Sequence, residues 1–322
     1  MKWRADIPSF FKEKLIVITG GGSGLGLQLA SRICSYGGKV IIIGRNLKRL
    51  QRAQKEILQK TPEAFLEFYS KDVSQYKEME SLFNEIHEKH GTINGVFINA
   101  SQVYINDFRQ IPFEKIEQVL TTNVNGAIYT ARAAVPYLNE VNSFLAFTSS
   151  IAGYAVAPES SIYTASKAAI ISFSRILSQE LAPRGVHVLT FSPGFFETTF
   201  AQGATATPFL MPIEKVVKRY LRAVVSKQEE VIFPFGLVCI LHYWKCLTFI
   251  GLGTPLSVFA CKRMHKFYGQ GKPHLNPEKE TFIQDSFGFR RLICCFSFNK
   301  HMADWLHDKC GFKREKLKNN IA

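Results

Sequence analysis

The 322-residue chain lacks the cysteine spacing of a disulfide framework or a zinc site. Its seven cysteines are odd in number and scattered, and none of them stands in a Cys-x-x-Cys pair. Structural disulfides are rare where thiols are kept reduced. We therefore expect no bound metal and a reducing compartment.

Long apolar runs are also missing from residues 1–14, so we expect neither a secretory signal nor an anchor there. No helix-turn-helix, zinc-finger or RNA-binding signature accompanies the net charge of +14. Half of that charge, a net +7, lies in residues 262–322, where it suits anionic lipid head groups as well as nucleic acid. We expect no nucleic-acid partner.

A glycine-rich loop joins an apolar strand to a helix near the start of the chain. Residues 15–18 lead directly into Thr19-Gly20-Gly21-Gly22-Ser23-Gly24-Leu25-Gly26, and a helical pattern follows from Leu27 to Tyr36. This order is the context that a dinucleotide loop requires. Gly20 would let the chain turn sharply, Gly24 would let the backbone approach a pyrophosphate, and Gly26 would let helix and strand pack closely. The predicted phosphate-binding residues at this helix N-terminus are Thr19, Gly20, Gly22, Ser23, Gly24, Leu25 and Gly26.

No acidic residue follows the second apolar strand, residues 40–43. An acid there binds the ribose hydroxyls of NAD and repels a 2′-phosphate. Here the strand ends in Gly44-Arg45-Asn46, and a guanidinium pairs well with phosphate. The sequence therefore favours NADP(H) with Arg45 as a cofactor-binding residue, and a solvated Arg45 is the alternative.

Strands and helices alternate through the first 230 residues. Apolar runs at 65–69, 95–98, 144–147 and 186–191 are followed in turn by Asp72-Val73, Asn99-Ala100-Ser101, Thr148-Ser149-Ser150 and Ser192-Pro193-Gly194. The alternation predicts an α/β fold, a doubly wound parallel sheet of the Rossmann type. Because ligands bind beyond the carboxyl ends of such strands, these motifs should surround one site.

Tyr163 and Lys167 stand four residues apart in a helical stretch, so their side chains share one face. A phenol has a pKa of about 10, and a nearby ammonium would lower it toward the range useful for proton transfer. Such a pair arises by chance on many helices, but here a dinucleotide loop and a serine precede it. Ser149 and Ser150 are both candidates, and the spacing to Tyr163 and the following residues 151–153 favour Ser150.

These motifs together resemble the short-chain dehydrogenase/reductase family over roughly residues 13–230. The family's Thr-Gly-x-x-x-Gly-x-Gly loop stands at residues 19–26, and its Asn-Ala-Gly element is Asn99-Ala100-Ser101. Its Asn-x-x-Gly motif is Asn123 to Gly126, and its serine is Ser150. Its Tyr-x-x-x-Lys pair is Tyr163 and Lys167, thirteen residues beyond the serine. Pro193-Gly194 with Thr198 is similar to its nicotinamide-side loop.

The resemblance implies a role for each of these positions. Tyr163 would exchange a proton with the substrate oxygen, Ser150 would hydrogen-bond that oxygen, and Lys167 would lower the tyrosine pKa and bind the nicotinamide ribose. Asn123 would anchor a water that relays protons from Lys167, and Thr198 would fix the carboxamide. Ser101 stands where the family usually has glycine, and we expect it to be tolerated. The remaining implied cofactor contacts are Asp72, Val73, Asn99, Ala100, Pro193, Gly194 and Phe196.

An apolar extension, residues 231–261, has Lys245 as its single formally charged member. Lys245 divides it into runs of 14 and 16 residues, each shorter than the ~20 that cross a bilayer. We expect insertion in the membrane plane or as a hairpin, with Tyr243 and Trp244 at the interface; a soluble lid and dimer helix is the alternative. The predicted organisation is a catalytic domain at 1–230, this apolar segment at 231–261, and a basic tail at 262–322.

A nucleotide-binding domain followed by an apolar extension is similar in plan to 3-ketosphinganine reductases and to hydroxysteroid and retinol dehydrogenases. The resemblance implies an NADP(H)-dependent oxidoreductase that interconverts a ketone and a secondary alcohol on a lipid-like substrate, such as a 3-ketosphinganine or a 3-oxoacyl lipid. A hydroxysteroid or retinol dehydrogenase and a non-catalytic membrane-peripheral scaffold are the alternatives. We expect association with a membrane, at the cytoplasmic face of the endoplasmic reticulum, and leave a homodimer open.

Overall fold

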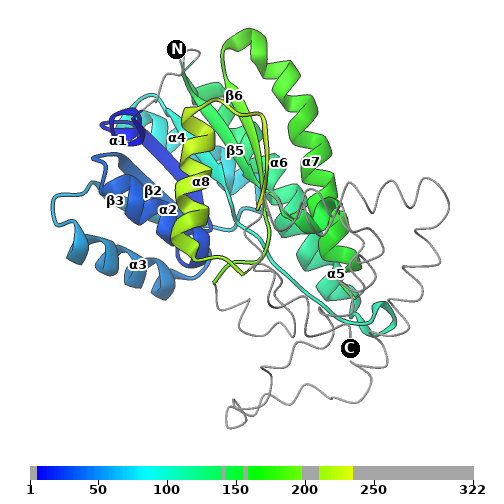
Figure 1. Cartoon of the computed structure of the whole chain (residues 1–322). Helices are drawn as coiled ribbons and strands as arrows, with labels where there is room; N and C mark the ends of the chain where they lie inside the picture. The colour runs from blue at the N-terminus through cyan, green and yellow to red at the C-terminus, as the bar shows by residue number, and fades with distance from the viewer. Residues whose placement is uncertain (1–5, 140–141, 155–158, 198–209, 235–322) are drawn as a thin grey trace, which may run out of the picture. The chain divides into compact units, whose positions relative to one another are not determined.

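Seven parallel strands form one sheet in a computed structural model that describes residues 6–139, 142–154, 159–197 and 210–234 (Figure 1). The strand order is β3-β2-β1-β4-β5-β6-β7, and every neighbouring pair is parallel. The strands are β1 (Leu15–Thr19), β2 (Lys39–Gly44), β3 (Leu66–Ser70), β4 (Gly95–Ile98), β5 (Phe144–Thr148), β6 (His187–Pro193) and β7 (Glu230–Phe233). The predicted doubly wound α/β fold is confirmed.

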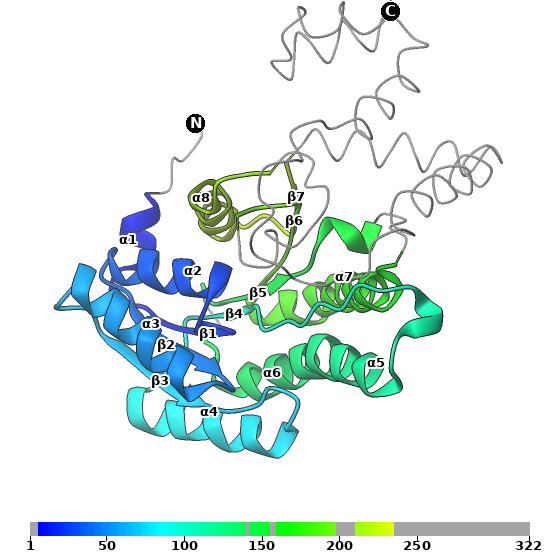
Figure 2. The same cartoon turned by 90° about the horizontal axis from the view of Figure 1, so that it is seen from below.

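Helices cover both faces of the sheet (Figure 2). One face carries α1 (Ile7–Phe11), α2 (Gly24–Cys34), α3 (Leu47–Lys60) and α8 (Ile213–Val225), whose buried residues form one apolar core. The other face carries α4 (Tyr76–His90), α6 (Gly126–Ala134) and α7 (Ser161–Leu181), whose buried residues form a second core, and α5 (Phe113–Leu120) lies against α7. Short turns connect them: η1 (Phe108–Gln110), η2 (Thr121–Asn125), η3 (Val135–Tyr137), η4 (Ile151–Tyr154) and η5 (Ala182–Arg184).

Burial on both faces explains why the central strands are continuous apolar runs rather than alternating ones. In β1, Ile16 and Ile18 belong to the core under α2, while Leu15 and Val17 belong to the core on the opposite face. Successive side chains of a strand point to opposite faces, so an uninterrupted apolar run is needed to fill both cores.

The sheet order places the functional motifs along one edge. β1 lies between β2 and β4, so the chain changes its direction of travel across the sheet at β1. The loops that follow β1 and β4 therefore leave the same edge side by side, which is where ligands bind in open α/β sheets. The glycine-rich loop follows β1, and Asn99 follows β4.

The predicted boundary at residue 230 falls inside the last strand. β7 pairs with β6 from Thr190–Glu230 to Pro193–Phe233, so the first residues of the predicted apolar segment belong to the sheet. The short edge strand was not predicted because it runs directly into a longer apolar stretch. Residues 235–261 and the tail 262–322 lie outside the described part of the chain. Among the described residues, no helix combines the length and the apolar character that crossing a membrane demands.

Candidate active site

Helix α7 carries Tyr163 and Lys167 in its first two turns. The Lys167 side chain is only 3% exposed, and its Nζ donates to the carbonyl oxygen of Thr148, at the end of β5, over 3.0 Å. Burial disfavours the charged form and lowers the pKa of Lys167 to about 8. The lysine is therefore held close to the range in which it can exchange protons.

Tyr163 lies beside this lysine, with Lys167 Nζ 5.7 Å from the centroid of its ring. Burial raises the pKa of Tyr163 above its ordinary value, and a hydrogen bond with Ser150 lowers it by less. The expectation that Lys167 lowers the tyrosine pKa is therefore not met in this structure. The physical reason is that burial acts on both groups, and the ammonium is bonded to a carbonyl oxygen rather than to the phenol.

The two adjacent serines after β5 have different partners. Ser149 is buried, and its hydroxyl donates to the backbone oxygen of Lys167 over 3.0 Å. Ser150 hydrogen-bonds Tyr163, and its Oγ also accepts from the backbone N–H of Ala152 over 3.1 Å. The structure thus brings Ser150, and not Ser149, to the tyrosine hydroxyl.

Asn123 lies in a single π-helical turn, η2, between α5 and α6. Its amide is 2% exposed and is satisfied within the protein. Nδ2 donates to the Gln102 carbonyl oxygen over 2.8 Å and to Ser166 Oγ over 3.0 Å. Oδ1 accepts from the Gln102 N–H over 2.7 Å and from Ser101 Oγ over 3.2 Å. The side chain thus ties the π-turn to the segment after β4 and to α7, and the water-anchoring role remains a prediction.

Ser101, where the resemblance leads one to expect glycine, takes part in this network through its bond to Asn123. The sequence reasoning assigned no role to Ser101 or Gln102. A polar pair directly after the Asn-Ala element was the signal that could have pointed to them.

The ends of β1 and β4 are joined through Thr19. Its hydroxyl is fully buried, accepts from the N–H groups of Asn99 and Ala100 over 3.0 and 3.1 Å, and donates to the Phe97 carbonyl oxygen over 3.4 Å. Asn99 Nδ2 in turn donates to the Thr19 carbonyl oxygen over 3.3 Å. The side chains of these two predicted cofactor residues therefore hydrogen-bond each other's residue, and these bonds fix the position of the glycine-rich loop.

Two glycines allow this loop its path. Gly20 has φ +68°, and a Cβ there would lie 2.9 Å from Ala100 Cα. A Cβ on Gly26 would lie 2.3 Å from the Gly20 carbonyl oxygen. Side chains at either position would push the loop away from the sheet edge.

The other predicted cofactor residues occupy the same edge. Val73 is buried, and a Cβ on Gly126 would lie 2.6 Å from it. Pro193 ends β6, the Gly194 N–H donates to the Phe233 carbonyl oxygen over 2.7 Å, and Phe196 packs against the core under α8. Thr198 lies outside the described residues.

Comparison of the sequence with known proteins identifies the family of this chain. The model of the short chain dehydrogenase family matches residues 14–208. The chain belongs to the short-chain dehydrogenase/reductase family. An uncharacterized oxidoreductase of Staphylococcus aureus (strain MRSA252) is 32% identical over 197 residues, which make up 61% of this chain and 83% of that protein.

Two solved structures show the range of nucleotides among similar folds. An NAD+-bound xylitol dehydrogenase has 26% sequence identity and a TM-score of 0.56, covering 59% of this chain and 73% of that one. An alcohol dehydrogenase from the archaeon Thermococcus sibiricus, complexed with 5-hydroxy-NADP, has 21% identity and a TM-score of 0.61, covering 68% and 95%. The second likeness shows the fold alone. This short-chain dehydrogenase/reductase is an oxidoreductase of a family that uses NAD(P)(H).

The residues at the loop fit such a dinucleotide. Helix α2 begins at Gly24, and its N-cap residue, Ser23, makes no side-chain capping bond. The first-turn N–H groups and the positive end of the helix dipole are thus not satisfied by a cap, which is the arrangement that binds phosphates. Leu25 is buried in the core, so it presents only its backbone to a ligand.

Arg45 of this dehydrogenase reaches across the edge of the sheet. Its Nη1 is 3.6 Å from Asp72 Oδ2, beyond β3. With the Gln102 amide turned so that its oxygen faces Arg45, that oxygen accepts from Arg45 Nη2 over 2.7 Å and from Thr122 Oγ1 over 2.9 Å. The guanidinium is half exposed and is held between the segments that follow β3 and β4. Sequence reasoning predicted neither partner.

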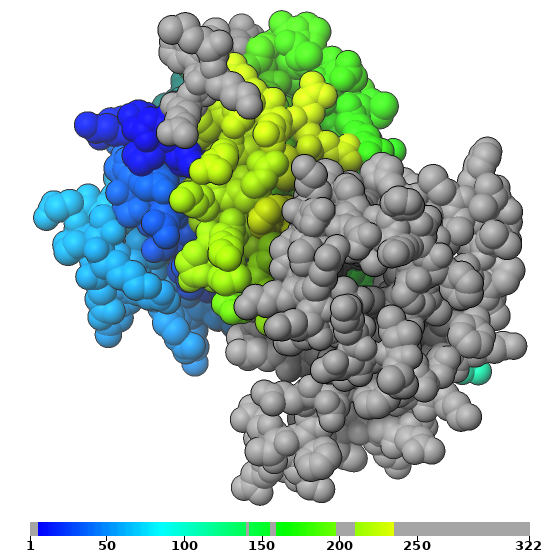
Figure 3. Space-filling model, in the orientation of Figure 1, coloured from blue at the N-terminus to red at the C-terminus, as the bar shows by residue number. Residues whose placement is uncertain are grey.

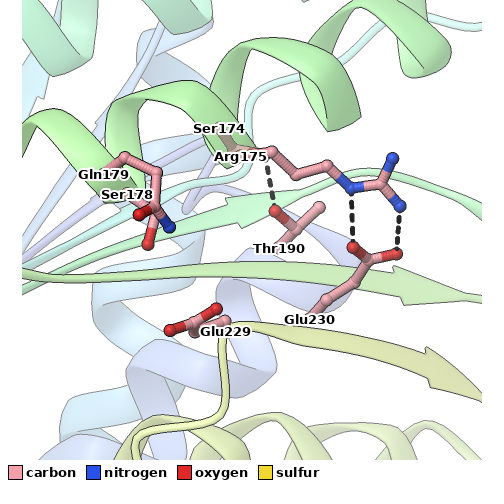
Figure 4. A pocket seen from close by; sticks show the side chains of 7 residues that line it. All are labelled: Ser174, Arg175, Ser178, Gln179, Thr190, Glu229 and Glu230. Carbon is pink, nitrogen blue, oxygen red and sulfur yellow. Dashed lines mark hydrogen bonds and ion pairs between the residues drawn. The ribbon is translucent and has the colours of Figure 1, made fainter.

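A polar pocket of about 230 Å³ lies away from these residues, between α7 and the strands β6 and β7 (Figure 4). Arg175 makes two hydrogen bonds of 2.8 Å with the Glu230 carboxylate, and the hydroxyls of Ser174 and Thr190 lie 2.5 Å apart. No predicted site residue lines it. Because its arginine and Glu230 neutralise each other, we interpret it as the join between the edge strand and α7.

Cys34 is the one cysteine in the described residues, and it is buried on α2. Burial raises the pKa of this thiol to about 12, so it stays protonated and unreactive.

Proposed function

We propose that this enzyme interconverts a ketone and a secondary alcohol on a lipid-like substrate, such as a 3-ketosphinganine or a 3-oxoacyl lipid, with NADP(H) as the hydride carrier. The hydrogen-bonded pair of Ser150 and Tyr163 is the observation that carries the proposal. Two hydroxyls bonded to each other beside a buried lysine suit a carbonyl oxygen that gains or loses a proton.

Ser150, Tyr163 and Lys167 each have a separate role in the proposed reaction. The bound nicotinamide supplies or accepts the hydride. Ser150 hydrogen-bonds the substrate oxygen and holds it beside Tyr163. Tyr163 gives its phenolic proton to that oxygen during reduction and takes it back during oxidation. Lys167 lies beside Tyr163, and because burial lowers its pKa to about 8, it can return a proton to the phenolate that remains after proton transfer.

The preference for NADP(H) rests on Arg45. No acid follows β2, and the half-exposed guanidinium lies at the sheet edge that binds the dinucleotide. Its contacts with Asp72 and Gln102 leave donors free, because a guanidinium carries five N–H groups. A 2′-phosphate would gain a charge-assisted bond there.

The lipid-like substrate and the membrane location rest on residues 231–261, whose composition suits the interface of a bilayer. We propose the cytoplasmic face of the endoplasmic reticulum as the location. Mass spectrometry of lipids that copurify with the full chain, followed by NADPH oxidation with the matching ketones, tests the substrate class. A steroid or retinoid as the one active substrate would replace the lipid proposal, and no oxidation with any ketone would favour the scaffold alternative.

Tyr163→Phe tests the mechanism. The variant keeps the ring and its packing but has no proton to give, so turnover should fall by at least about a thousandfold. The Kd for NADPH, measured by nucleotide fluorescence, should stay within about threefold of the wild-type value. This change is smaller than the loss of one hydrogen bond would cause. Ser149→Ala serves as the control, since its hydroxyl bonds the backbone. Residual turnover near the wild-type level would exclude Tyr163 as the proton donor.

Arg45→Ala tests the nucleotide preference. Loss of a charge-assisted bond should raise the KM for NADPH by roughly ten- to a hundredfold while the KM for NADH changes little. Arg32→Ala, at the far end of α2, is the control. Equal rises for both nucleotides would argue against a contact between Arg45 and the 2′-phosphate.

A further inference from the structure

The two helical layers of this enzyme differ sharply in charge. The layer of α1, α2, α3 and α8 contains ten Lys and Arg and two Glu, a net +8. The opposite helices α4, α5, α6 and α7 contain six Lys and Arg and seven Glu, a net −1. The positive charge of the helices is therefore concentrated on one face of the domain. Figure 3, coloured by residue number, looks onto this face, with α8 in yellow-green beside the blue α2 and α3. We call it the basic face.

The cations of the basic face have few protein partners. Within the described part of the chain, Lys60 is the one of the ten with an ion pair, to Glu56 at 2.8 Å. Exposed cations recur on one side of α3 at Lys48, Arg52 and Lys55 and on one side of α8 at Lys218 and Arg222. Helix α2 lies between α3 and α8 and has Arg32 as its one charged residue. The basic face thus joins two stripes of free cations across a helix without acids.

Fold stability does not account for this arrangement. Lys48 stands in the first turn of α3, which contains no acid, so its charge lies at the positive end of the helix dipole. On α8, burial lowers the pKa of Arg219 and repulsion from Arg222 lowers it further. Like charges held this close cost stability, which an anionic partner would relieve.

Two exposed leucines lie at the end of the basic face nearest the active site. Leu47 opens α3 and is 48% exposed, and Leu210 precedes α8 by three residues and is 47% exposed. Both helices follow segments that leave the carboxyl edge of the sheet, the edge that holds the nucleotide loop and Tyr163. Apolar side chains beside lysines and arginines are typical of surfaces that enter the head-group region of a membrane.

We propose that the basic face docks on a bilayer that contains anionic lipids. The described chain ends just after β7, whose Phe233 packs against the core under α8. In the sequence, Lys245 is the one formally charged residue between Phe233 and Cys261. The described chain thus ends beside the core that underlies the basic face. A broad layer of parallel helices also suits a flat lipid surface better than a nucleic-acid groove, which takes a single helix or ribbon.

The inference deepens the proposed function, because docking would bring the carboxyl edge of the sheet close to substrates dissolved in the bilayer. Docking is measured without turnover, so the two can fail separately. Vesicle binding without turnover of any lipid ketone would support docking by the basic face and contradict the proposed reaction. Turnover of a lipid ketone without vesicle binding would support the proposed reaction and contradict docking.

The test compares two charge-matched variants of the full chain. Arg52→Glu/Lys218→Glu/Arg222→Glu alters the basic face, and Lys77→Glu/Lys115→Glu/Arg132→Glu alters exposed cations of α4, α5 and α6. Both lower the net charge equally and avoid the catalytic and cofactor residues. Co-sedimentation uses vesicles of pure phosphatidylcholine and vesicles with about 30% phosphatidylserine at about 0.1 M salt, where charges still act over a Debye length of about 10 Å.

The wild type should bind the anionic vesicles, and the basic-face variant should bind them at least about tenfold more weakly. The control variant should bind the anionic vesicles within about twofold of the wild type, since its substitutions lie on the opposite helical layer, away from the basic face. Thermal unfolding checks that both variants fold. Equal losses in the two variants, wild-type binding in the basic-face variant, or equal binding of the wild type to neutral vesicles would each overturn the proposal. Binding of a duplex RNA probe through the basic face, without vesicle binding, would assign it to nucleic acid instead.

Discussion

At the scale of single residues, Lys167 shows how exclusion of water changes the titration of a side chain in the site. Its ammonium is buried and donates to the Thr148 carbonyl oxygen, and desolvation dominates its titration. A buried cation of this kind is a cost to the fold. Its position beside Tyr163 gives a functional reason to retain it.

The pH dependence of stability should reveal this cost. The pKa of Lys167 is about 8 in the folded chain against 10.5 for a solvent-exposed lysine, so between these values the unfolded chain binds a proton that the folded chain lacks. Stability from this group therefore rises with pH across that window, and the full penalty, about 3 kcal/mol, is present below it.

Lys167→Met removes the titration while keeping a long side chain. The free energy of unfolding of the wild type, relative to the variant, should improve by about 3 kcal/mol as the pH rises from about 7 to about 10.5. The absolute gain of the variant at neutral pH should be smaller, because the Thr148 carbonyl oxygen loses its donor. Urea unfolding at several pH values measures the difference. Parallel curves for the two proteins would show that Lys167 does not titrate in this range.

At the scale of elements, the π-turn η2 joins three parts of the site. Asn123 bonds Gln102 and Ser101 after β4 and Ser166 on α7, while the turn itself interrupts the helix from α5 to α6. π-turns often mark functional positions because they sacrifice regular bonding to place a side chain. Here the side chain fixes the distance between the cofactor edge and the helix of Tyr163.

Asn123→Ala should therefore cost both stability and activity. Removing the amide breaks four hydrogen bonds and leaves the part-buried backbone N–H and C=O of Gln102 without this partner, so the free energy of unfolding should fall by about 2–4 kcal/mol. Ser101→Ala removes one bond at a more exposed position and should cost about 1 kcal/mol or less. Chemical denaturation of both variants and their turnover measure this. Similar stabilities for the two would contradict a central role for the Asn123 amide.

At the scale of the whole molecule, the order of the strands assembles the site. Thr19 and Asn99 are 80 positions apart, yet they bond because β1 and β4 are neighbours. The same order separates the helices into a basic layer and a nearly neutral one. Helices α3 and α8 of the basic layer follow segments that leave the carboxyl edge of the sheet, the same edge at which Tyr163 lies.

Much of the fold could be predicted from local pattern. The strand at 15–18, the glycine loop and the shared face of Tyr163 and Lys167 each depend on residues a few positions apart, where apolar runs, glycines and helical spacing act directly. The predicted helix after the loop differed only at its ends, since α2 begins at Gly24 and ends at Cys34. The edge strand β7 was not predicted, because four residues before a longer apolar run carry no boundary signal.

Other properties depended on contacts between distant segments. The partners of Ser149 and Ser150, the reach of Arg45 to Asp72 and Gln102, and the raised pKa of Tyr163 follow from packing between separate elements. The basic face likewise combines α3 and α8, more than 150 positions apart in the chain. Local pattern carries no information on which segments become neighbours or how much water they exclude. Those two quantities set the hydrogen-bond partners, the pKa values and the surface charge, so only the folded chain reveals them.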